Sequence, residues 1–230
     1  MIFSASDGSS ADSHWAREEL CRIYWRPVFV LARAESKSQQ DAEDLTQGFF
    51  SNLLEKDWLA AADPGKGRFR DYLRFAFRRF CCNEWDKIRA EKRGGRVAFV
   101  SLSANDIALG DLKELSGTDS PDTLYDRRWA LELIERTFVA LHQEQKSKKD
   151  PQEEKRFLSL KPFIWRDSRE TSYADVALQL GLSKESAVKM RVSRLRQRFG
   201  ELMRQEIALT VRTAAEIDDE IQELFRVFNR

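Results

Sequence analysis

Residues 172–199, SYADVALQLGLSKESAVKMRVSRLRQRF, carry the most specific signal in the chain and decide its expected fold. An apolar helical face opens the stretch at Tyr173, Val176, Ala177 and Leu180. Gly181 and Leu182 then indicate a turn, and Ser183 is the type of residue that caps a following helix. The spacing predicts a helix-turn-helix, whose second helix typically enters the major groove of DNA.

The second helix of this stretch is predicted to separate apolar from cationic side chains. Its apolar face holds Val188, Val192, Leu195 and Phe199. The rest of its surface and its start hold the candidate duplex-binding residues Lys184, Ser186, Lys189, Met190, Arg191, Ser193, Arg194, Arg196 and Arg198. Lys and Arg side chains can donate hydrogen bonds to guanine edges or to phosphates. The alternative is an ordinary amphipathic helix pair with a solvated basic face.

Charge is distributed in blocks along a chain whose formal net charge is only +1. Residues 66–96 hold eleven basic and four acidic residues, and residues 184–204 hold seven basic and two acidic residues. The stretches 35–63 and 101–126 are acidic instead. Two basic surfaces of this kind suit a polyanion such as nucleic acid, and the acidic blocks suit a different partner.

The composition excludes several other classes of protein. With 42% hydrophobic and 33% charged residues among 230, the chain is neither collagenous nor wholly disordered. No stretch approaches the roughly 18 apolar residues of a membrane span, so we expect a cytoplasmic protein with no membrane partner. Cys21, Cys81, Cys82, His14 and His142 lack metal-ligand spacing, so we expect buried cysteines and no metal or cofactor. No phosphate loop or activated nucleophile is evident, and an enzyme is not expected.

Apolar periodicity predicts an all-α chain. Helices are expected from about residue 15, from Asp41, over 68–92, over 124–142, over 156–165 and in the carboxy-terminal tail. Pro27 is expected to bend or interrupt the first of them, and Pro151 to lie in a loop. We therefore expect two helical domains joined by an acidic linker. The expected parts are a disordered amino terminus (1–14), a helical domain (15–98), the linker (99–123), a helix-turn-helix domain (124–205) and a helical extension (206–230).

The predicted basic helix interleaves cations with aromatic side chains at Phe69, Tyr72, Phe75, Phe77, Phe80 and Trp85. A protein that binds single strands needs stacking faces as well as cations, whereas a duplex reader needs mainly cations and hydrogen-bonding tips. Most of these aromatic side chains must fill the core of so small a domain. The cationic ridge is therefore the firmer candidate for contact with nucleic acid.

The order of these pieces is more specific than any one of them. DAEDLTQGFFSNLL (41–54) is followed by FRDYLRFAFRRFCCNEWDKIRAEKR (69–93), an acidic linker and the helix-turn-helix. In this order the chain resembles bacterial RNA polymerase sigma factors of the extracytoplasmic-function (ECF) type, over roughly residues 15–205. The resemblance implies a first domain that binds the clamp helices of core RNA polymerase and opens the minus-10 promoter element. It implies a second domain that recognises the minus-35 element as duplex DNA.

The resemblance also assigns candidate site residues in the first domain. The candidates for binding core polymerase are Asp41, Asp44, Leu45, Gln47 and Phe49. Acidic side chains at this place also suit the positive amino end of a helix, which is the alternative for Asp41 and Asp44. The candidates for binding the melted strand are Lys66, Arg68, Arg78, Arg79, Asn83, Lys87 and Arg89. Asn83 matches a base-binding Asn of the family, and the loop 63–68 matches its base-capturing loop.

Two stretches depart from the family pattern. The connection 142–171 is longer and more charged, and the tail 206–230 extends past the expected end. An apolar stripe runs along the tail at Ile217, Ile221, Leu224 and Phe228. The stripe predicts that the tail is buried, either on its own domain or against another subunit.

The leading hypothesis is a sigma factor whose partners are core RNA polymerase and promoter DNA, both duplex and single-stranded. The alternative is a helix-turn-helix transcriptional regulator that binds duplex DNA without core polymerase. The sequence leaves open whether an anti-sigma or other regulatory protein binds the chain.

Overall fold

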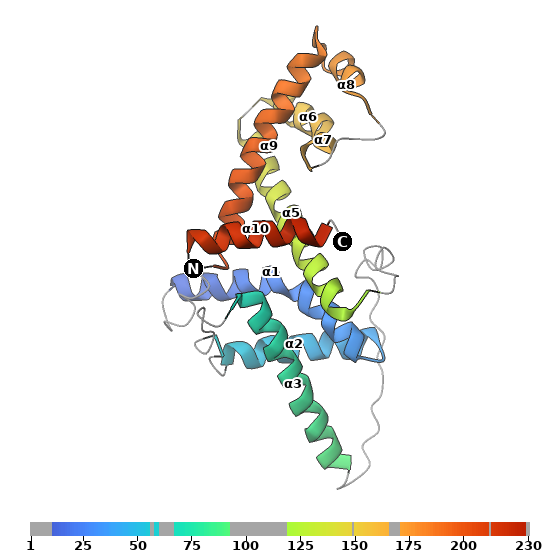
Figure 1. Cartoon of the computed structure of the whole chain (residues 1–230), viewed down its shortest axis with the longest axis vertical. Coiled ribbons are helices and arrows are strands. Elements are labelled where there is room, and N and C mark those ends of the chain that lie inside the picture. Colours follow the sequence, from blue (N-terminus) through green and yellow to red (C-terminus); the bar gives the residue numbers. More distant parts are fainter. Residues whose placement is uncertain are drawn as a thin grey trace. The chain divides into compact units, whose positions relative to one another are not determined.

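The computed structural model of the chain describes residues 11–55, 58–59, 67–92, 119–148, 150–165, 171–211 and 213–228 (Figure 1). All regular structure in these ranges is helical and no strand occurs in them, which confirms the expected all-α class. The helices are α1 (Ala11–Glu35), α2 (Gln39–Glu55), α3 (Phe69–Lys92), α5 (Pro121–Ser147), α6 (Pro151–Leu160), α7 (Pro162–Trp165), α8 (Tyr173–Gln179), α9 (Glu185–Ala208) and α10 (Ala214–Phe228).

Two compact units make up the chain. Unit 1 comprises Met1–Glu132 together with Ala208–Arg230, and unit 2 comprises Leu133–Ile207. This division differs from the expected domain ends, because it falls inside α5 and assigns the carboxy-terminal extension to the same unit as the first part of the chain. Disorder was expected over residues 1–14, but α1 begins at Ala11, so the expectation is corrected for 11–14. Residues 1–10 and most of the expected linker lie outside the described residues.

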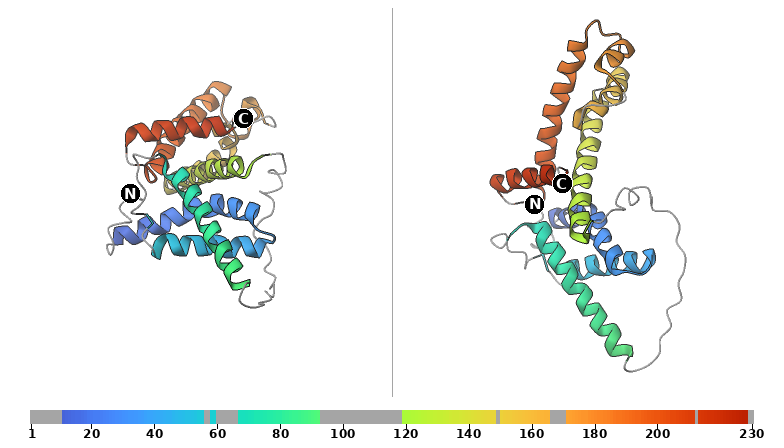
Figure 2. Two further views of the ribbon diagram at one scale, coloured as in Figure 1. Left: turned by 60° about the horizontal axis from the view of Figure 1, so that its bottom comes forward. Right: turned by 45° about the vertical axis from the view of Figure 1, so that its right-hand side comes forward.

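The core of unit 1 lies between the apolar faces of its helices, with α1 and α2 side by side (Figures 1 and 2). Its largest fully buried side chains are Leu20, Ile23, Tyr24, Phe49, Leu53, Leu73, Phe77, Tyr125 and Trp129. The rings of Phe49 and Phe77 meet edge to face, with their centroids 5.4 Å apart. Pro27 lies within α1 and does not end it, contrary to one of the two outcomes expected for that residue.

The helix α10 is buried in unit 1 with the amino-terminal part of the chain, whereas the tail was expected on its own domain or against another subunit. Leu224 is fully buried, whereas Ile217, Ile221 and Phe228 are half-buried, so the predicted stripe is confirmed in part. Glu220 and Glu223 share the buried face with Leu224 and Val227, because their positions follow helical spacing. The carboxylates on this face therefore need charged partners inside the unit.

In the core of unit 2, the short helices α6, α7 and α8 pack against the first half of α9. One buried cluster of this core consists of Leu160, Phe163, Val176, Ala177, Val188 and Val192, with Tyr173, Leu180, Leu182 and Leu195 packed against it. Ser172 caps α8 and exchanges hydrogen bonds with Asp175 in a capping box. Gly181 follows α8 with φ +64°, a left-handed conformation that favours glycine, and the Leu182 N–H closes the turn on the Ala177 carbonyl at 2.8 Å. Residues 172–199 thus form two helices joined by a tight turn.

The helix α5 extends beyond its predicted ends. Ser120 accepts a hydrogen bond from the Thr123 N–H at 3.2 Å and so caps a helix that begins at Pro121. The helix continues to Ser147 instead of ending near His142, and the following helix begins at Pro151, capped by Asp150. The predicted loop around Pro151 is therefore shorter than expected, and that proline begins α6.

Candidate nucleic-acid interface

The helix α9 presents one apolar and one polar face, as its sequence predicts. Val188, Val192 and Phe199 are buried in unit 2. Seven of the nine candidate duplex-binding residues are exposed: Lys184, Ser186, Lys189, Met190, Ser193, Arg194 and Arg196. We call the first six of them the α9 face, because Arg196 is bound to a backbone carbonyl of unit 2.

The cations of the α9 face have partners that are exposed or uncharged. Lys189 Nζ lies 2.6 Å from Glu185 Oε1 and 5.5 Å from the centre of the Tyr173 ring. The hydrogen bond to that carboxylate raises the pKa of Lys189 above its usual 10.5, so the ammonium group is charged at neutral pH. Arg194 Nη2 lies 3.7 Å from the sulfur of Met190, which is 57% exposed. Neither contact buries its cation, so both remain available to a phosphate or a base edge.

Three further arginines of α9 have partners within unit 2. Arg196 donates to the Phe163 carbonyl from Nε at 2.9 Å and from Nη2 at 2.8 Å. Arg198 binds both carboxylate oxygens of Glu144, at 2.9 and 2.5 Å, and also Glu201 at 2.6 Å. Arg191 Nη1 lies 3.9 Å from Glu153 Oε1. Arg196 and Arg198 thus connect α9 to α7 and α5, a structural role that the sequence did not reveal.

The electrostatics of the Arg198 contact follow from its geometry. The bidentate hydrogen bonds from Arg198 hold the pKa of Glu144 below its usual 4.5. The carboxylates in turn raise the pKa of Arg198 still further above its usual 12.5. Both partners are therefore fully charged at neutral pH. Figure 2 shows α9 beside the second half of α5, the two helices that this ion pair joins.

Cations and aromatic rings share the exposed surface of α3. Arg78, Arg79, Asn83 and Lys87 are exposed, and so are Phe75 (68%) and Trp85 (44%). The other aromatic side chains of the helix, Phe69, Tyr72, Phe77 and Phe80, are buried or half-buried, which confirms that most of them serve the core. We call the exposed set the α3 face. It combines rings that can stack with cations and an amide that can bind nucleotides.

Two cations of the α3 face form exposed ion pairs. Arg78 Nη2 lies 2.6 Å from Asp122 Oδ1, and Lys87 Nζ lies 2.6 Å from Glu84 Oε1. Exposed pairs of this kind are weak, so a phosphate can compete for either cation. Lys66 and the side chain of Arg89, two further candidates for the melted strand, lie outside the described residues.

Arg68 differs from the other melted-strand candidates because acidic residues of α10 bind it. Its Nε lies 3.6 Å from Glu220 Oε1, and its Nη1 lies 3.5 Å from Glu223 Oε2. The neighbouring Arg70 is almost fully buried, with Nε 3.4 Å from Glu220 Oε2 and its guanidinium 4.3 Å from the centre of the Trp129 ring. Arg68 is half-buried and shared between these carboxylates, so it is less available to DNA than the cations of the α3 face.

The buried carboxylates of unit 1 are perturbed by their surroundings. Burial raises the pKa of Glu220 above its usual 4.5, although Arg70 and Arg68 act in the opposite direction. Burial likewise raises the pKa of Asp126, which contacts Arg70 at 3.4 Å and Arg74 at 3.5 Å. Sequence reasoning missed this cluster. The available signal was the spacing of Glu220 and Glu223 on one helical face with Leu224 and Val227.

The candidates for binding core polymerase divide into exposed and buried residues. Asp41, Asp44 and Gln47 are exposed on α2, and Leu45 is half-buried. Phe49 is fully buried in the core of unit 1, so its place on the proposed contact surface is corrected. Asp41 also has a local role, because its N–H donates to Ser38 Oγ at 3.0 Å and its carboxylate accepts from the Ser38 N–H at 3.2 Å. Asp41, Asp44 and Gln47 are thus the exposed members of the group, and Asp41 also takes part in capping α2.

Within the described ranges, no cluster of three or more His, Cys, Asp and Glu side chains could hold a metal ion. In the same residues, no helix has both the length and the apolar character of a membrane span. Cys81 is buried as expected, but Cys21 is half-buried and Cys82 is exposed, which corrects the expectation for Cys82. Burial raises the pKa of Cys21 to about 11 and that of Cys81 to about 12, so both are thiols at neutral pH.

A scan against protein-family models, a search of curated proteins and a search of solved structures each gave no match to this chain. The geometry of the α9 and α3 faces is therefore the basis on which a function is assigned.

Proposed function

We propose that the chain is a promoter-recognition subunit of bacterial RNA polymerase, a sigma factor that binds the core enzyme and directs it to two DNA elements. The observation that carries the proposal is the exposure of the Phe75 and Trp85 rings among the cations of α3, in a chain that also has the α9 face. A protein that binds only duplex DNA has no use for stacking surfaces beside its cations.

The α9 face is suited to duplex DNA. Lys189 and Arg194 are exposed cations that reach phosphates or guanine edges, and Ser193 lies between them in the sequence and can donate to either. The core of unit 2 fixes the orientation of the helix, and Arg196 and Arg198 anchor its second half. This rigid support allows the first half of α9 to enter the major groove as a recognition helix.

The α3 face is suited to single-stranded DNA. Stacking a base on an aromatic ring contributes about 1–3 kcal/mol, and extruding a base from a duplex costs a few kcal/mol. Phe75 and Trp85 can therefore offset much of the cost of opening, and Arg79 can neutralise a phosphate beside them. Asn83 is exposed on the same helix, and its amide can both donate to and accept from a base edge.

The acidic surface of α2 is suited to the protein partner. Asp44 and Gln47 are exposed one turn apart, so they can meet basic and polar side chains on one helix of core polymerase. Catalysis of nucleotide addition belongs to the polymerase in this proposal. The chain itself supplies affinity for DNA and a surface that holds the melted strand.

The proposal is tested by separating the two DNA-binding faces. Trp85→Ala should weaken binding to a forked template with an unpaired strand about tenfold and leave duplex binding unchanged, because one stacking contact is lost. Arg194→Ala should weaken duplex binding and lower its salt slope by about one contact. Trp15→Ala, which removes a tryptophan of α1 that is 45% exposed, is the control and should change neither.

The alternative regulator predicts a different pattern. It binds duplex DNA through α9, does not discriminate forked from duplex templates and forms no complex with core polymerase. Equal effects of Trp85→Ala and Trp15→Ala on the forked template, with no complex between the wild-type chain and core polymerase, would reject the sigma-factor proposal in favour of this alternative.

A further inference from the structure

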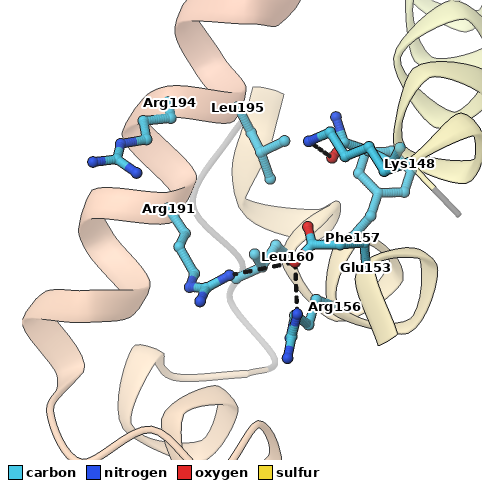
Figure 3. A pocket seen from close by; sticks show the side chains of 9 residues that line it. Lys148, Glu153, Arg156, Phe157, Leu160, Arg191, Arg194 and Leu195 are labelled. Carbon is cyan, nitrogen blue, oxygen red and sulfur yellow. Dashed lines mark hydrogen bonds and ion pairs between the residues drawn. The ribbon is translucent and has the colours of Figure 1, made fainter. Parts of the chain in front are cut away.

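A hollow of about 160 Å³ lies in unit 2 where α6 meets the flank of α9. Its cationic lining residues are Lys148, Arg156, Arg191 and Arg194, and Glu153 is its only acidic lining residue among the described residues (Figure 3). The lining therefore carries a formal charge of +3. The volume is several times the roughly 30 Å³ of one water molecule, so a tetrahedral oxyanion fits in it.

The four cations of the hollow outnumber the two carboxylates, Glu153 and Asp150, with which they form ion pairs. Arg156 Nη1 lies 2.6 Å from Glu153 Oε1, and Arg191 Nη1 lies 3.9 Å from the same oxygen, beyond hydrogen-bonding distance. Figure 3 shows these two guanidinium groups directed toward that single carboxylate from different helices. Glu153 is the one carboxylate of the lining, and Arg156 Nη1 also lies 3.4 Å from Asp150 Oδ2, which does not line the hollow.

The other two cations contact uncharged groups. Lys148 Nζ donates to the amide oxygen of Gln145 at 2.7 Å, and Arg194 Nη2 lies 3.7 Å from the Met190 sulfur. Neither contact compensates the positive charge. The hollow thus offers several N–H donors to a group that carries negative charge and accepts many hydrogen bonds, which are the properties of a phosphate.

The floor of the hollow strengthens this electrostatic preference. Phe157 and Leu160 are each 2% exposed, and the half-buried Leu195 lies beside them. Apolar walls lower the local dielectric constant, so the attraction between an arginine and an anion is stronger there than on an open surface. The hollow also continues into the α9 face, because Arg194 belongs to both.

We propose that this hollow is a phosphate-binding site, formed by the end of α5, by α6 and by α9. Two sources can supply the phosphate. One is the backbone of duplex DNA beside the α9 face, a source that rests on the proposed function. The other is a free phosphate or a small phosphorylated molecule, which requires no DNA.

The experiment uses the full chain with two probes, inorganic phosphate and a duplex DNA that the wild-type chain binds. Phosphate is titrated against chloride at constant ionic strength and followed through the arginine side-chain NMR signals. Arg156→Gln and Arg191→Gln each remove one cation of the hollow. Lys155→Gln is the matched control, because it removes one exposed cation of α6 that does not line the hollow.

The proposal expects both arginine variants to weaken phosphate binding about tenfold or more, and the control to bind as the wild type does. If DNA is the source, free phosphate binds weakly or not at all. In that case the arginine variants lower the salt slope of duplex binding by about one contact, and Lys155→Gln leaves it unchanged.

Glu153→Gln separates binding from folding. This variant keeps every donor and removes the competing carboxylate, so the site should bind phosphate more tightly, whereas a loosened α6 would bind it more weakly. The proposal is overturned if Arg156→Gln and Arg191→Gln behave like Lys155→Gln with both probes. If the wild-type chain binds no DNA, the proposed function fails. The phosphate titration alone then decides whether the hollow binds phosphate.

Discussion

Replacing Arg70 by methionine should destabilise unit 1 far more than the same change at an exposed arginine of the same helix. Arg70 is 3% exposed and lies 3.4 Å from both Glu220 Oε2 and Asp126 Oδ1. Methionine keeps much of the volume of the side chain and removes its charge. Arg70→Met therefore leaves two carboxylates in a buried site without their shared cation.

The magnitude follows from what remains around these carboxylates. Removing one partner of a buried ion pair costs about 3–5 kcal/mol. Arg68 still lies 3.6 Å from Glu220 Oε1, and Arg74 still lies 3.5 Å from Asp126 Oδ2, so the cost should fall near the lower end, about 3 kcal/mol. Burial also raises the pKa of Glu220, so this group can take up a proton and relieve part of the penalty.

The double variant Arg70→Met with Glu220→Leu provides an internal check. The Arg70 Nε and the Glu220 Oε2 form an ion pair without hydrogen-bond geometry. Replacing both members of such a pair by apolar side chains is often neutral, so the double variant should recover most of the loss. Urea unfolding followed by hydrogen exchange, resolved to peptides of unit 1 and unit 2, measures each unit separately.

Arg78→Met is the matched control, because Arg78 pairs with Asp122 at 2.6 Å but its side chain is 51% exposed. It should change the free energy of unfolding by less than about 1 kcal/mol. Equal effects of Arg70→Met and Arg78→Met would refute the reasoning, and so would a double variant that is less stable than Arg70→Met alone.

The two units should respond to pH in opposite directions, because burial raises the pKa of Glu220 in unit 1 and Arg198 lowers the pKa of Glu144 in unit 2. Because burial raises the folded pKa of Glu220, its contribution to stability is complete below the usual 4.5 and is lost as the pH rises through the raised value. Arg198 lowers the pKa of Glu144, so the contribution of Glu144 to the stability of unit 2 is lost as the pH falls below 4.5. Unfolding measured for each unit at pH 7 and at pH 4 should therefore show that unit 2 loses stability relative to unit 1. Gly181→Ala should lower the free energy of unfolding by about 1–2 kcal/mol, because the φ angle of this residue is +64°. Gly200→Ala within α9 should raise the free energy of unfolding by up to about 1 kcal/mol. Chemical denaturation of both variants measures these changes. Asp44→Arg should weaken binding to core polymerase and leave duplex binding unchanged, and equal loss of both would contradict the assignment of α2.

Local patterns in the sequence predict the parts of the fold that depend on nearby residues. The α8–turn–α9 segment follows from apolar spacing and a glycine within 28 residues, and the two helices and their turn lie where that pattern indicates. The cap differs, because Ser172 caps α8 and α9 begins at Glu185, two residues after the expected cap Ser183. The start of α5 was missed, although Ser120 and Pro121 are the residue types that begin a helix. Phe49 is instructive, because helical periodicity with Leu53 points to the core, whereas the family resemblance pointed to the surface.

Interactions between distant residues could not be predicted from the same patterns. Arg198 was expected to neutralise DNA phosphates, but its partner Glu144 lies 54 residues away in the sequence. Glu220 and Glu223 can be buried because they form ion pairs with an arginine about 150 residues earlier in the sequence. Periodicity identifies which face of a helix is buried, but it does not identify the side chain that meets it. For this reason the exposed α9 face was predicted well and the internal roles of its arginines were not.

Transcription in vitro tests the central proposal most directly. Purified core polymerase, a library of promoter sequences and the full chain are combined, and transcripts are mapped to their start sites. The proposal predicts transcripts that require the chain, begin at defined positions downstream of a shared pair of DNA elements, and are lost with Asp44→Arg or Trp85→Ala. Transcription that is the same with and without the chain on every template would contradict it.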